Sequence, residues 1–446
     1  MPDVVVVGAG AAGIIAAWRA AMLGARVTIV EKTNRVGTKI LVSGGGKCNI
    51  THDGPIEDVL RAFRPAEARF LRPSCYRFLN TEIVDMLTSR GLKVYTRPDG
   101  RIFPIDSTAK DVVAILEGYL RDAGVEVLKE SPVTGLIIED GRAVGIRYRR
   151  AGELLKSRPA AAEGYRAKTA KNLIRELDPV AQAEGDETRL NASKVILCCG
   201  GSSYPNSGTT GDGWPWMREA GHRVERLRAA LAPIYLEDAP AELSGVSLRA
   251  ALLRARQGRE IARWTGDLLF THHGVSGPAA LGISRQVVEA MDGREVSLEV
   301  DLLADLSPEQ TTSQLLAYTG AHPSRRVSSY VAELAPERAL PLIFQAAMVD
   351  LDVTGARLDK KSRNRLAATL KGWPLGKVRH VPLEKGEVVA GGVSLDEVDP
   401  HTMASKKIEN LYLCGEILDI AGPVGGYNLQ AAFATGYVAG ESAATL

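Results

Sequence analysis

The stretch "DVVVVGAGAAG" at residues 3–13 decides the fold of this chain. Its four consecutive valines predict a buried strand, and the glycines that follow have the order G-x-G-x-x-G. Apolar spacing then predicts a helix over residues 14–24 and a second strand over residues 25–32. Because the glycine motif follows a strand and opens a helix, it predicts a βαβ unit that binds a dinucleotide.

Each glycine of this motif has its own physical role. Gly8 permits the tight turn, Gly10 lets backbone approach a pyrophosphate, and Gly13 allows the helix to pack closely on the strand. The helix N-terminus offers free N–H groups and partial positive charge to phosphates. Glu31 ends the second strand, where a carboxylate accepts both ribose hydroxyls and repels a 2′-phosphate. This pattern favours the adenosine of FAD or NAD over that of NADP.

The C-terminal segment indicates which dinucleotide is bound, FAD or NAD. The runs "NLYLCGE" (410–416) and "GPVGGYNLQAAFATG" (422–436) predict a strand, a Gly-Glu pair, a glycine turn and a helix. In flavoproteins with two dinucleotide folds, such a segment returns to the flavin. The acidic residue meets the ribityl chain, and the helix dipole stabilises negative charge on the reduced ring. A simple NAD dehydrogenase needs no such segment.

Changes in the apolar pattern divide the chain into four parts. Residues 1–206 and 375–446 predict two parts of one FAD-binding domain, residues 207–304 a β-rich insert, and residues 305–374 a small helical subdomain. Residues 133–150 predict a hairpin around "EDGR", and the polar stretch at 152–188 predicts an excursion from the domain.

Composition limits the class of protein. The 446 residues imply two or three domains, and 55 Lys plus Arg against 53 Asp plus Glu give a net charge of only +2. We therefore expect no nucleic-acid or membrane partner, and a small-molecule substrate. The first residues run directly into a strand and predict no signal peptide, and no apolar run reaches the roughly 18 residues of a membrane helix. The five scattered cysteines predict reduced thiols in a cytoplasmic protein, and no spacing predicts a metal site.

The run "LVSGGGKCNI" (41–50) can be interpreted as a P-loop, as a redox centre at Cys48, or as a loop in which Cys48 only packs. As an ATP-binding P-loop it fails, because Leu41 stands where the first glycine belongs and Cys48 where Ser or Thr belongs. As a redox centre it has no nearby partner cysteine, so Cys48 is favoured as a packing residue, with a reactive thiol as the alternative. Cys198 and Cys199 end an apolar strand and are expected to be buried small residues.

Catalytic residues are less defined than cofactor residues. His272 and His273 could move protons at neutral pH, and Arg101 and Tyr427 are further candidates. For each of them a structural role is the favoured alternative. Two basic clusters, "RAALLRARQGREIAR" (249–263) and "RLDKKSRNR" (357–365), are expected to be solvated faces, with attraction of an anionic substrate or a nicotinamide dinucleotide as the alternative.

The order of several blocks along the chain carries a family resemblance. These blocks are "VVVVGAGAAG", "GTKILVSGGGKCNITH", "GRIFPIDSTAKDVV", "CCGGSSYPNSGTTGDGW", "LLFTHHGVSGPAAL" and "GGVSLDEVDPHTMASKKIENLYLCGEILDIAGPVGGYNLQAAFATG". The chain resembles the HI0933-like, or BaiN-type, NAD(P)/FAD-dependent oxidoreductases, which include aminoacetone-oxidase-like flavoproteins. The resemblance implies an α/β fold, in which a Rossmann-like FAD-binding domain is interrupted by a β-barrel-like insert and a small helical domain. The stretch at 152–188 departs from the family's pattern by its length.

The resemblance also implies the contacts to FAD. The pyrophosphate would lie on Gly8, Gly10, Ala11, Ala12 and Gly13. The adenosine would meet Glu31, Lys32 and Val133. The loop beside the flavin would comprise Gly37, Lys39, Ser43, Gly44, Gly45, Gly46, Lys47, Cys48 and Asn49. The site would be closed by Gly200, Gly201, Gly415, Glu416, Asp419, Gly425, Gly426, Tyr427, Asn428, Leu429 and Gln430.

The expected function is an FAD-dependent oxidoreductase that passes a hydride between a small organic substrate, or NAD(P)H, and flavin N5. A second dinucleotide fingerprint is missing, because "SGTTGDGW" (207–214) lacks the G-x-G-x-x-G order. NAD(P)H is therefore expected only as a transient electron donor. Two alternatives are an amine oxidase that produces peroxide and a flavin-bound regulatory or binding protein without turnover.

Overall fold

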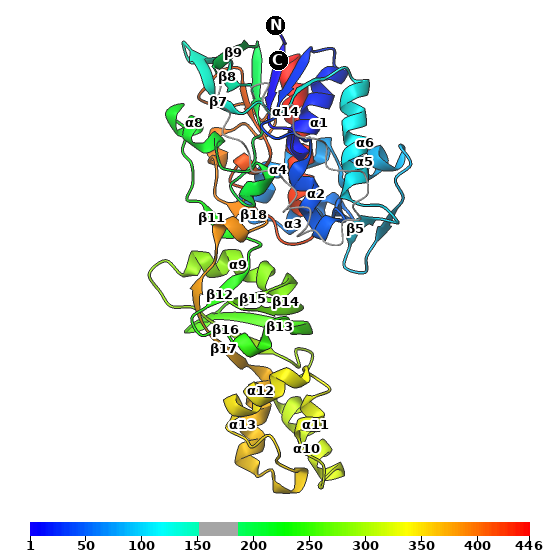
Figure 1. Ribbon diagram of the computed structural model, residues 1–446, viewed down its shortest axis with the longest axis vertical. Coiled ribbons are helices and arrows are strands. Elements are labelled where there is room, and N and C mark those ends of the chain that lie inside the picture. Colours follow the sequence, from blue (N-terminus) through cyan, green and yellow to red (C-terminus); the bar gives the residue numbers. More distant parts are fainter. Residues whose placement is uncertain (151–185) are drawn as a thin grey trace. The chain divides into compact units, whose positions relative to one another are not determined.

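The computed structural model describes residues 1–150 and 186–446, which divide into two compact units. Unit 1 comprises Met1–Leu227 with Val388–Leu446, and unit 2 is Arg228–Glu387 (Figure 1). These boundaries lie later than the expected 207 and 375. Residues 207–227 stay in unit 1, where Trp214 Nε1 donates to Ile417 O over 3.1 Å. Most of the expected excursion at 152–188 lies outside the described residues.

A five-stranded parallel sheet forms the centre of unit 1. Its strand order is β19-β10-β1-β2-β6, in which β1 (Val4–Val7) pairs with both β2 (Val27–Val30) and β10 (Lys194–Leu197). The outer strands are β6 (Glu126–Leu128) and β19 (Leu411–Leu413). All four valines of β1 are buried, as a strand covered on both faces requires. The predicted βαβ unit is therefore confirmed.

Two helices from opposite ends of the chain pack together on this sheet. In Figure 1, α1 (Ala11–Met22, blue) and α14 (Tyr427–Thr445, red) lie side by side, and they contact each other extensively. A Cβ atom at Gly436 or Gly440 would overlap with the carbonyl oxygen of Ala12 or Ala16, respectively. The two helix axes thus approach at glycines, which brings the C-terminal segment to the first glycine turn.

The rest of unit 1 consists of two small antiparallel sheets and shorter helices. The first sheet has the order β7-β8-β9 and contains the predicted hairpin, with a third strand that the sequence did not reveal. Its strands are β7 (Val133–Glu139), β8 (Arg142–Arg149) and β9 (Glu187–Asn191). The second sheet comprises β3 (Thr51–His52), β5 (Arg101–Pro104) and β4 (Val94–Thr96). The helices are α2 (Thr38–Val42), α3 (Ile56–Arg61), α4 (Pro65–Arg77), α5 (Asn80–Thr88), α6 (Ala109–Asp122) and α8 (Gly213–Glu219).

Unit 2 contains a closed antiparallel barrel and a group of helices. The barrel has the order β12-β15-β14-β13-β16-β17. Its strands are β12 (Ile234–Leu236), β13 (Ser247–Gln257), β14 (Arg259–Thr271), β15 (Gly274–Ser276), β16 (Ser297–Asp301) and β17 (Trp373–His380). Residues 375–387 belong here rather than to the FAD-binding domain, because β17 closes the barrel by pairing with β12 and β16.

The helices of unit 2 pack on the barrel and on one another around one apolar core. They are α9 (Pro278–Ala290), α10 (Pro308–Ala321), α11 (Ser328–Val331), α12 (Leu340–Ala347) and α13 (Lys360–Lys371). The short strands β11 (Arg228–Ala230) and β18 (Val388–Ala390) mark the ends of the insert. The predicted fold class, an α/β domain interrupted by a barrel and helices, is confirmed. Within the described residues, every helix is too short or too polar to span a lipid bilayer.

Candidate functional site

The N-terminus of α1 has the features of a phosphate site. Gly10, the N-cap residue, has extended backbone and gives no side-chain cap, and the first turn contains no acidic residue. The leading N–H groups therefore keep their capacity to bind an anion. At Gly13 a Cβ atom would overlap with the carbonyl oxygen of Gly8, which accounts for the predicted close packing.

Glu31 lies directly beside this turn. Its carboxylate accepts the backbone N–H of Ala9 over 2.8 Å and that of Thr33 over 2.8 Å. The N–H of Ser131 donates to the carbonyl of Glu31 over 2.9 Å, which holds the strand start at Val133 close by. Glu31, Lys32 and Val133, the residues predicted for the adenosine side, therefore lie close together. The ribose contact of Glu31 stays a prediction.

Lys32 has protein partners that the sequence did not indicate. Its Nζ lies 2.6 Å from the carboxylate of Asp212 and 2.5 Å from the hydroxyl of Thr210. Both partners belong to "SGTTGDGW", the Gly-rich run without a dinucleotide fingerprint. An ion pair and a hydrogen bond therefore tie this run to the end of β2.

The loop after α2 presents its backbone outward. Gly44, Gly45 and Gly46 have φ angles of 56°, 70° and 90°, a left-handed run that side chains would strain. Gly44, Gly45 and Lys47 are exposed, whereas Cys48 is fully buried. Burial raises the pKa of the Cys48 thiol to about 12, so it stays protonated at neutral pH. These facts support the packing role of Cys48 over the reactive thiol.

Asn49 connects this loop to the C-terminal segment. With its amide oriented so that both groups are satisfied, its oxygen accepts the N–H of Gly426 over 2.9 Å and its nitrogen donates to the carbonyl of Thr51 over 3.2 Å. The loop and the start of α14 are therefore held together, as the resemblance implies for a shared flavin site.

Lys39 and Glu416 form a second connection across the sequence. Their side chains pair over 2.5 Å, and Lys39 Nζ also lies 2.9 Å from the hydroxyl of Ser203. The other oxygen of Glu416 accepts the N–H of Val389 over 3.0 Å. A Cβ at Gly201 would lie 2.9 Å from the Glu416 carboxylate carbon. Lys39, Gly201 and Glu416, three predicted residues from distant segments, therefore lie together. Ser203 also contacts this group, although the sequence did not predict it.

The N-terminus of α14 resembles that of α1. Its N-cap residue Gly426 has φ 88° and gives no side-chain cap, and its first turn lacks acidic residues. Tyr427 stacks on His52 with 4.7 Å between ring centroids, and burial raises the pKa of the Tyr427 hydroxyl. His52, which sequence reasoning missed, lies 3.2 Å through Nδ1 from the carbonyl of Gly425, so this nitrogen carries the proton.

Other predicted residues in this segment hold its backbone. Asn428 accepts the N–H of Gly422 over 2.8 Å and donates to its carbonyl over 2.9 Å. The buried Gln430 accepts from the Thr51 hydroxyl over 2.9 Å and donates to the Phe78 carbonyl over 3.0 Å. Asp419 likewise accepts the N–H of Gly391 over 2.9 Å. These side chains fix the loop geometry from behind.

Several candidates belong to unit 2 or are already engaged by protein groups. Arg101 pairs with Asp99 over 2.6 Å. His272 and His273 are exposed in the turn between β14 and β15, within unit 2. Cys198 is buried and its thiol donates to the carbonyl of Val7 over 3.1 Å. Cys199 is only partly covered, and burial of its thiol still raises the pKa to about 12.

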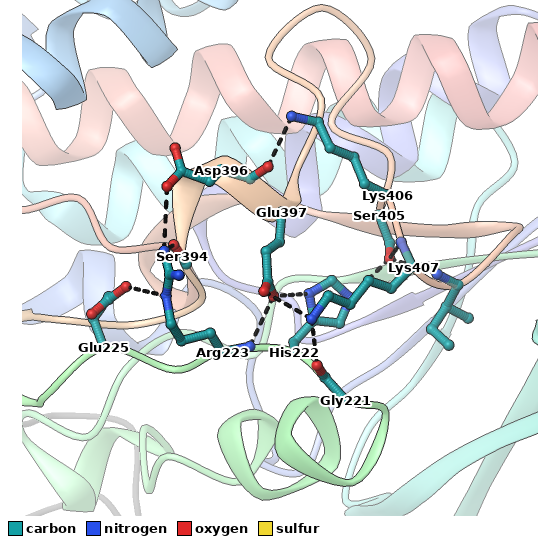
Figure 2. Close-up of polar contacts among 11 residues, drawn as sticks. Gly221, His222, Arg223, Glu225, Ser394, Asp396, Glu397, Ser405, Lys406 and Lys407 are labelled. Carbon is teal, nitrogen blue, oxygen red and sulfur yellow. Dashed lines mark hydrogen bonds and ion pairs between the residues drawn. The ribbon is translucent and has the colours of Figure 1, made fainter.

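A polar cluster in unit 1 escaped the sequence interpretation altogether (Figure 2). The buried His222 lies 3.1 Å through Nδ1 from Glu397 and 2.8 Å through Nε2 from the hydroxyl of Ser405. The same hydroxyl accepts the N–H groups of Lys407 and Ile408 over 3.1 and 2.9 Å. Burial lowers the pKa of His222, so the ring is neutral at physiological pH.

The contacts of this cluster hold two segments of the chain together, residues 221–222 and residues 397–407. Lys407 Nζ pairs with Glu397 over 2.8 Å and lies 2.6 Å from the carbonyl of Gly221. The residues after α8 are thereby tied to the segment that leads into β19, and β19 is followed by the Gly-Glu pair of the candidate site. No spacing in the sequence predicts the cluster, because its two halves are far apart along the chain.

Taken together, the residues of unit 1 fit FAD. Two uncapped helix N-termini, one exposed glycine backbone and a carboxylate beside the first turn form a donor and acceptor set suited to pyrophosphate, flavin and ribose. Comparison with known protein families supports the same cofactor, FAD. The HI0933-like protein Rossmann domain matches residues 2–167 and 160–442 of this chain. The chain belongs to this family. It is therefore an FAD-dependent oxidoreductase of the HI0933-like family.

Three relatives are similar over nearly their whole length. A 3-dehydro-bile acid delta(4,6)-reductase of Clostridium scindens is 29% identical, over 98% of this chain and 98% of its own. A ribosomal RNA dihydrouridine synthase of Escherichia coli is 26% identical, over 98% of this chain and 97% of its own. A second ribosomal RNA dihydrouridine synthase, from Haemophilus influenzae, is 27% identical over 97% of this chain and 96% of its own.

Among solved structures, two steroid enzymes share the fold. The 3-ketosteroid delta1-dehydrogenase of Sterolibacterium denitrificans has a TM-score of 0.53 at 15% identity, covering 99% of each chain. The 3-ketosteroid-delta4-(5alpha)-dehydrogenase of Rhodococcus jostii has a TM-score of 0.52 at 15% identity, covering 100% of this chain and 97% of its own. At these identities the likeness concerns the fold alone.

Proposed function

We propose that this enzyme saturates a carbon–carbon double bond conjugated to a carbonyl group. The observation that carries the proposal is the shared chemistry of the relatives aligned over nearly their full length. A delta(4,6)-reductase of a 3-dehydro bile acid and a dihydrouridine synthase both reduce a double bond within a ring. In both substrates a ring carbonyl can conjugate with the bond. A ring in which a carbon–carbon double bond is conjugated to a carbonyl, a polarised enone, is therefore the substrate class that the two relatives have in common.

The reaction needs one hydride and one proton. FAD, when bound and reduced by NAD(P)H, supplies hydride chemistry at flavin N5. In the proposed reaction the enone would gain a hydride at its β-carbon and a proton at its α-carbon, with NAD(P)H as the two-electron donor that is oxidised to NAD(P)+. In this proposal the N-termini of α1 and α14 bind and orient the cofactor, and the exposed glycine backbone at residues 44–46 lies against it.

Tyr427 is the proposed proton donor. It is the first residue of α14, and its raised pKa keeps the hydroxyl protonated at neutral pH. Stacking on His52 fixes the ring. His52 itself is a weaker candidate, because its Nδ1–H is engaged by the carbonyl of Gly425 and its Nε2 faces Gly100.

The test is anaerobic flavin reduction followed by reoxidation. Purified holoenzyme is reduced with NADH or NADPH and then offered a 3-keto-4-ene steroid, a uridine-containing RNA, and a saturated ketone as control. We expect loss of the oxidised-flavin absorbance with a nicotinamide donor and its return with an enone, with the saturated product detected by mass spectrometry. Reduction of the flavin by amines alone, with peroxide formed in air, would instead support the amine oxidase and sink this proposal.

A further inference from the structure

A group of cations converges at one end of the helices of unit 2. Arg325 and Arg326 lie between α10 and α11, Arg357 ends the 3-10 turn Gly355–Arg357, and Lys360 and Lys361 begin α13. These five residues are termed the cationic ridge. Backbone contacts hold its segments together: the N–H of Gly355 donates to the carbonyl of Arg325 over 2.9 Å, and Arg326 forms a β-bridge with Thr354.

The ridge is poorly neutralised. All five residues are exposed. Within the part of the chain that the structure describes, Arg326 alone of the five has an ion-pair partner, Asp352 at 3.0 Å. The neighbouring carboxylates are those of Asp350, Asp352 and Asp359. Asp359 is engaged as the N-cap of α13, where it accepts the N–H groups of Lys361 and Ser362 over 2.7 and 2.9 Å. Five ridge cations thus stand beside three carboxylates in the sequence, and all three carboxylates are engaged, since Asp350 accepts the N–H of Asp352 over 2.9 Å.

The other basic cluster of unit 2 behaves differently. On the barrel strands, Arg254 pairs with the buried Asp301 over 2.7 Å, Arg256 with Glu299 over 2.7 Å and Arg249 with Asp267 over 2.6 Å. Those arginines are explained by their partners within the barrel. The two basic runs predicted as solvated faces thus differ. The barrel arginines named above are paired, whereas Arg357, Lys360 and Lys361 of the run at 357–365 are exposed without an ion-pair partner among the described residues.

Helix stability does not explain the ridge either. The N-terminal end of a helix carries partial positive charge, so cations there are unfavourable. Lys360 and Lys361 are nevertheless the first two residues of α13, and its first turn contains no acidic residue. An external anion that spans several cations would relieve this repulsion, and a chain of phosphates supplies such an anion.

From these observations we infer that the cationic ridge is a docking surface for RNA. The inference rests on the proposed reductase function, with the uracil ring of a uridine in RNA as the conjugated acceptor. The occupant follows from charge complementarity and from two relatives of nearly equal length that act on ribosomal RNA. Lysine and arginine contacts to phosphates fix the register of an RNA without reading its sequence. The net charge of +2 averages over the chain and conceals this local excess.

The test compares two triple variants of the full-length holoenzyme. The ridge variant combines Arg325→Gln, Lys360→Gln and Lys361→Gln. The control combines Arg259→Gln, Arg294→Gln and Lys385→Gln, three exposed cations elsewhere in unit 2, so that both lose the same charge. Binding of a fluorescein-labelled RNA hairpin with a uridine-rich loop is measured by anisotropy over a series of NaCl concentrations. A DNA hairpin of the same sequence and heparin serve as competitors.

We expect the ridge variant to bind RNA at least about 10-fold more weakly at low salt, and the slope of log K against log salt to become shallower by about 2, because three phosphate contacts are lost. The control should stay within about threefold of the wild type, since distant charges are screened. Equal losses in both variants, or equal binding of DNA hairpin and RNA, would overturn the inference. Thermal unfolding checks the fold, and the ridge variant should be at least as stable as the wild type.

The two proposals fail separately. Reduction of a small enone should be unchanged in both variants, because neither variant replaces a residue of the candidate site in unit 1. An enzyme that reduces enones but binds RNA equally well without the ridge would keep the reductase function and refute the docking surface. RNA binding that depends on the ridge, without reduction of any double bond, would refute the reductase function alone.

Discussion

The helices α14 and α13 begin in opposite ways. At α14 the N-cap is a glycine without side-chain cap, and a stacked Tyr–His pair follows. At α13 the N-cap is Asp359, which accepts two backbone N–H groups, and two lysines follow. The first N-terminus keeps its own amides for a ligand, at some cost to helix stability. The second satisfies its amides internally and places its cations outward. The start of α14 thus offers backbone amides to the proposed cofactor, whereas the start of α13 satisfies two of its amides itself and exposes cations instead.

The largest expected effect comes from breaking the close approach that brings α14 to α1. Gly436→Ala places a Cβ against the carbonyl oxygen of Ala12, and we expect the free energy of unfolding to fall by about 3 kcal/mol, with weaker FAD retention. Urea unfolding followed by flavin fluorescence measures both. As control, Gly320→Ala in α10 has open space around its Cβ and should stabilise by up to about 1 kcal/mol. Equal stability of the two variants would contradict the role of the Gly436 contact.

Tyr427→Phe tests the chemistry at the start of α14. Loss of the hydroxyl should reduce the rate of enone reduction by about 100-fold, because general acid catalysis is typically of this size, while FAD binding and reduction by NAD(P)H persist. Stopped-flow measurement separates the two half-reactions. Tyr437→Phe, a half-buried ring in the same helix that stacks on Phe78 with 5.0 Å between ring centroids, is the matched control. An unchanged oxidative half-reaction in Tyr427→Phe would remove this residue as proton donor.

Asp359→Ala tests the capped end of α13. Removing the carboxylate leaves two N–H groups without their partner, so stability should fall by about 1 kcal/mol. FAD content should not change. Asp359→Asn keeps an N-cap acceptor and should recover most of the loss. Thermal unfolding of the three proteins is the measurement, and a loss that Asn fails to recover would point to charge rather than capping.

An effect confined to acidic pH concerns the His222 cluster that positions the approach to β19. Burial lowers the pKa of His222 below its ordinary 6.5, so the unfolded chain binds the proton more readily. Stability from this residue is full above pH 6.5 and is lost as pH falls below it. In His222→Gln the slope of stability against pH between 5 and 6.5 should decrease, by up to about 1.4 kcal/mol per pH unit. Chemical denaturation at a series of pH values shows this, and an identical slope would exclude His222 as its source.

Local chemistry explains why much of this enzyme was predictable from its sequence. The valines of β1, the spacing of residues 8–13 and the glycine turn before α14 act within a few residues, and periodicity and backbone freedom suffice to interpret them. The hairpin of β7 and β8 was predictable for the same reason. These features predicted the βαβ unit, the return of the C-terminal helix and the FAD-binding fold, and the structure agrees.

Tertiary structure alone decided which side chains meet. Lys39 pairs with Glu416, Lys32 with Asp212, and His52 stacks on Tyr427, all across large separations in sequence. It also decided that β17 closes the barrel, that Cys48 is buried with a raised thiol pKa, and that the barrel arginines are paired while most of the cationic ridge is not. The physical reason is that such contacts depend on how distant segments pack. Neither residue type nor spacing along the chain contains that information.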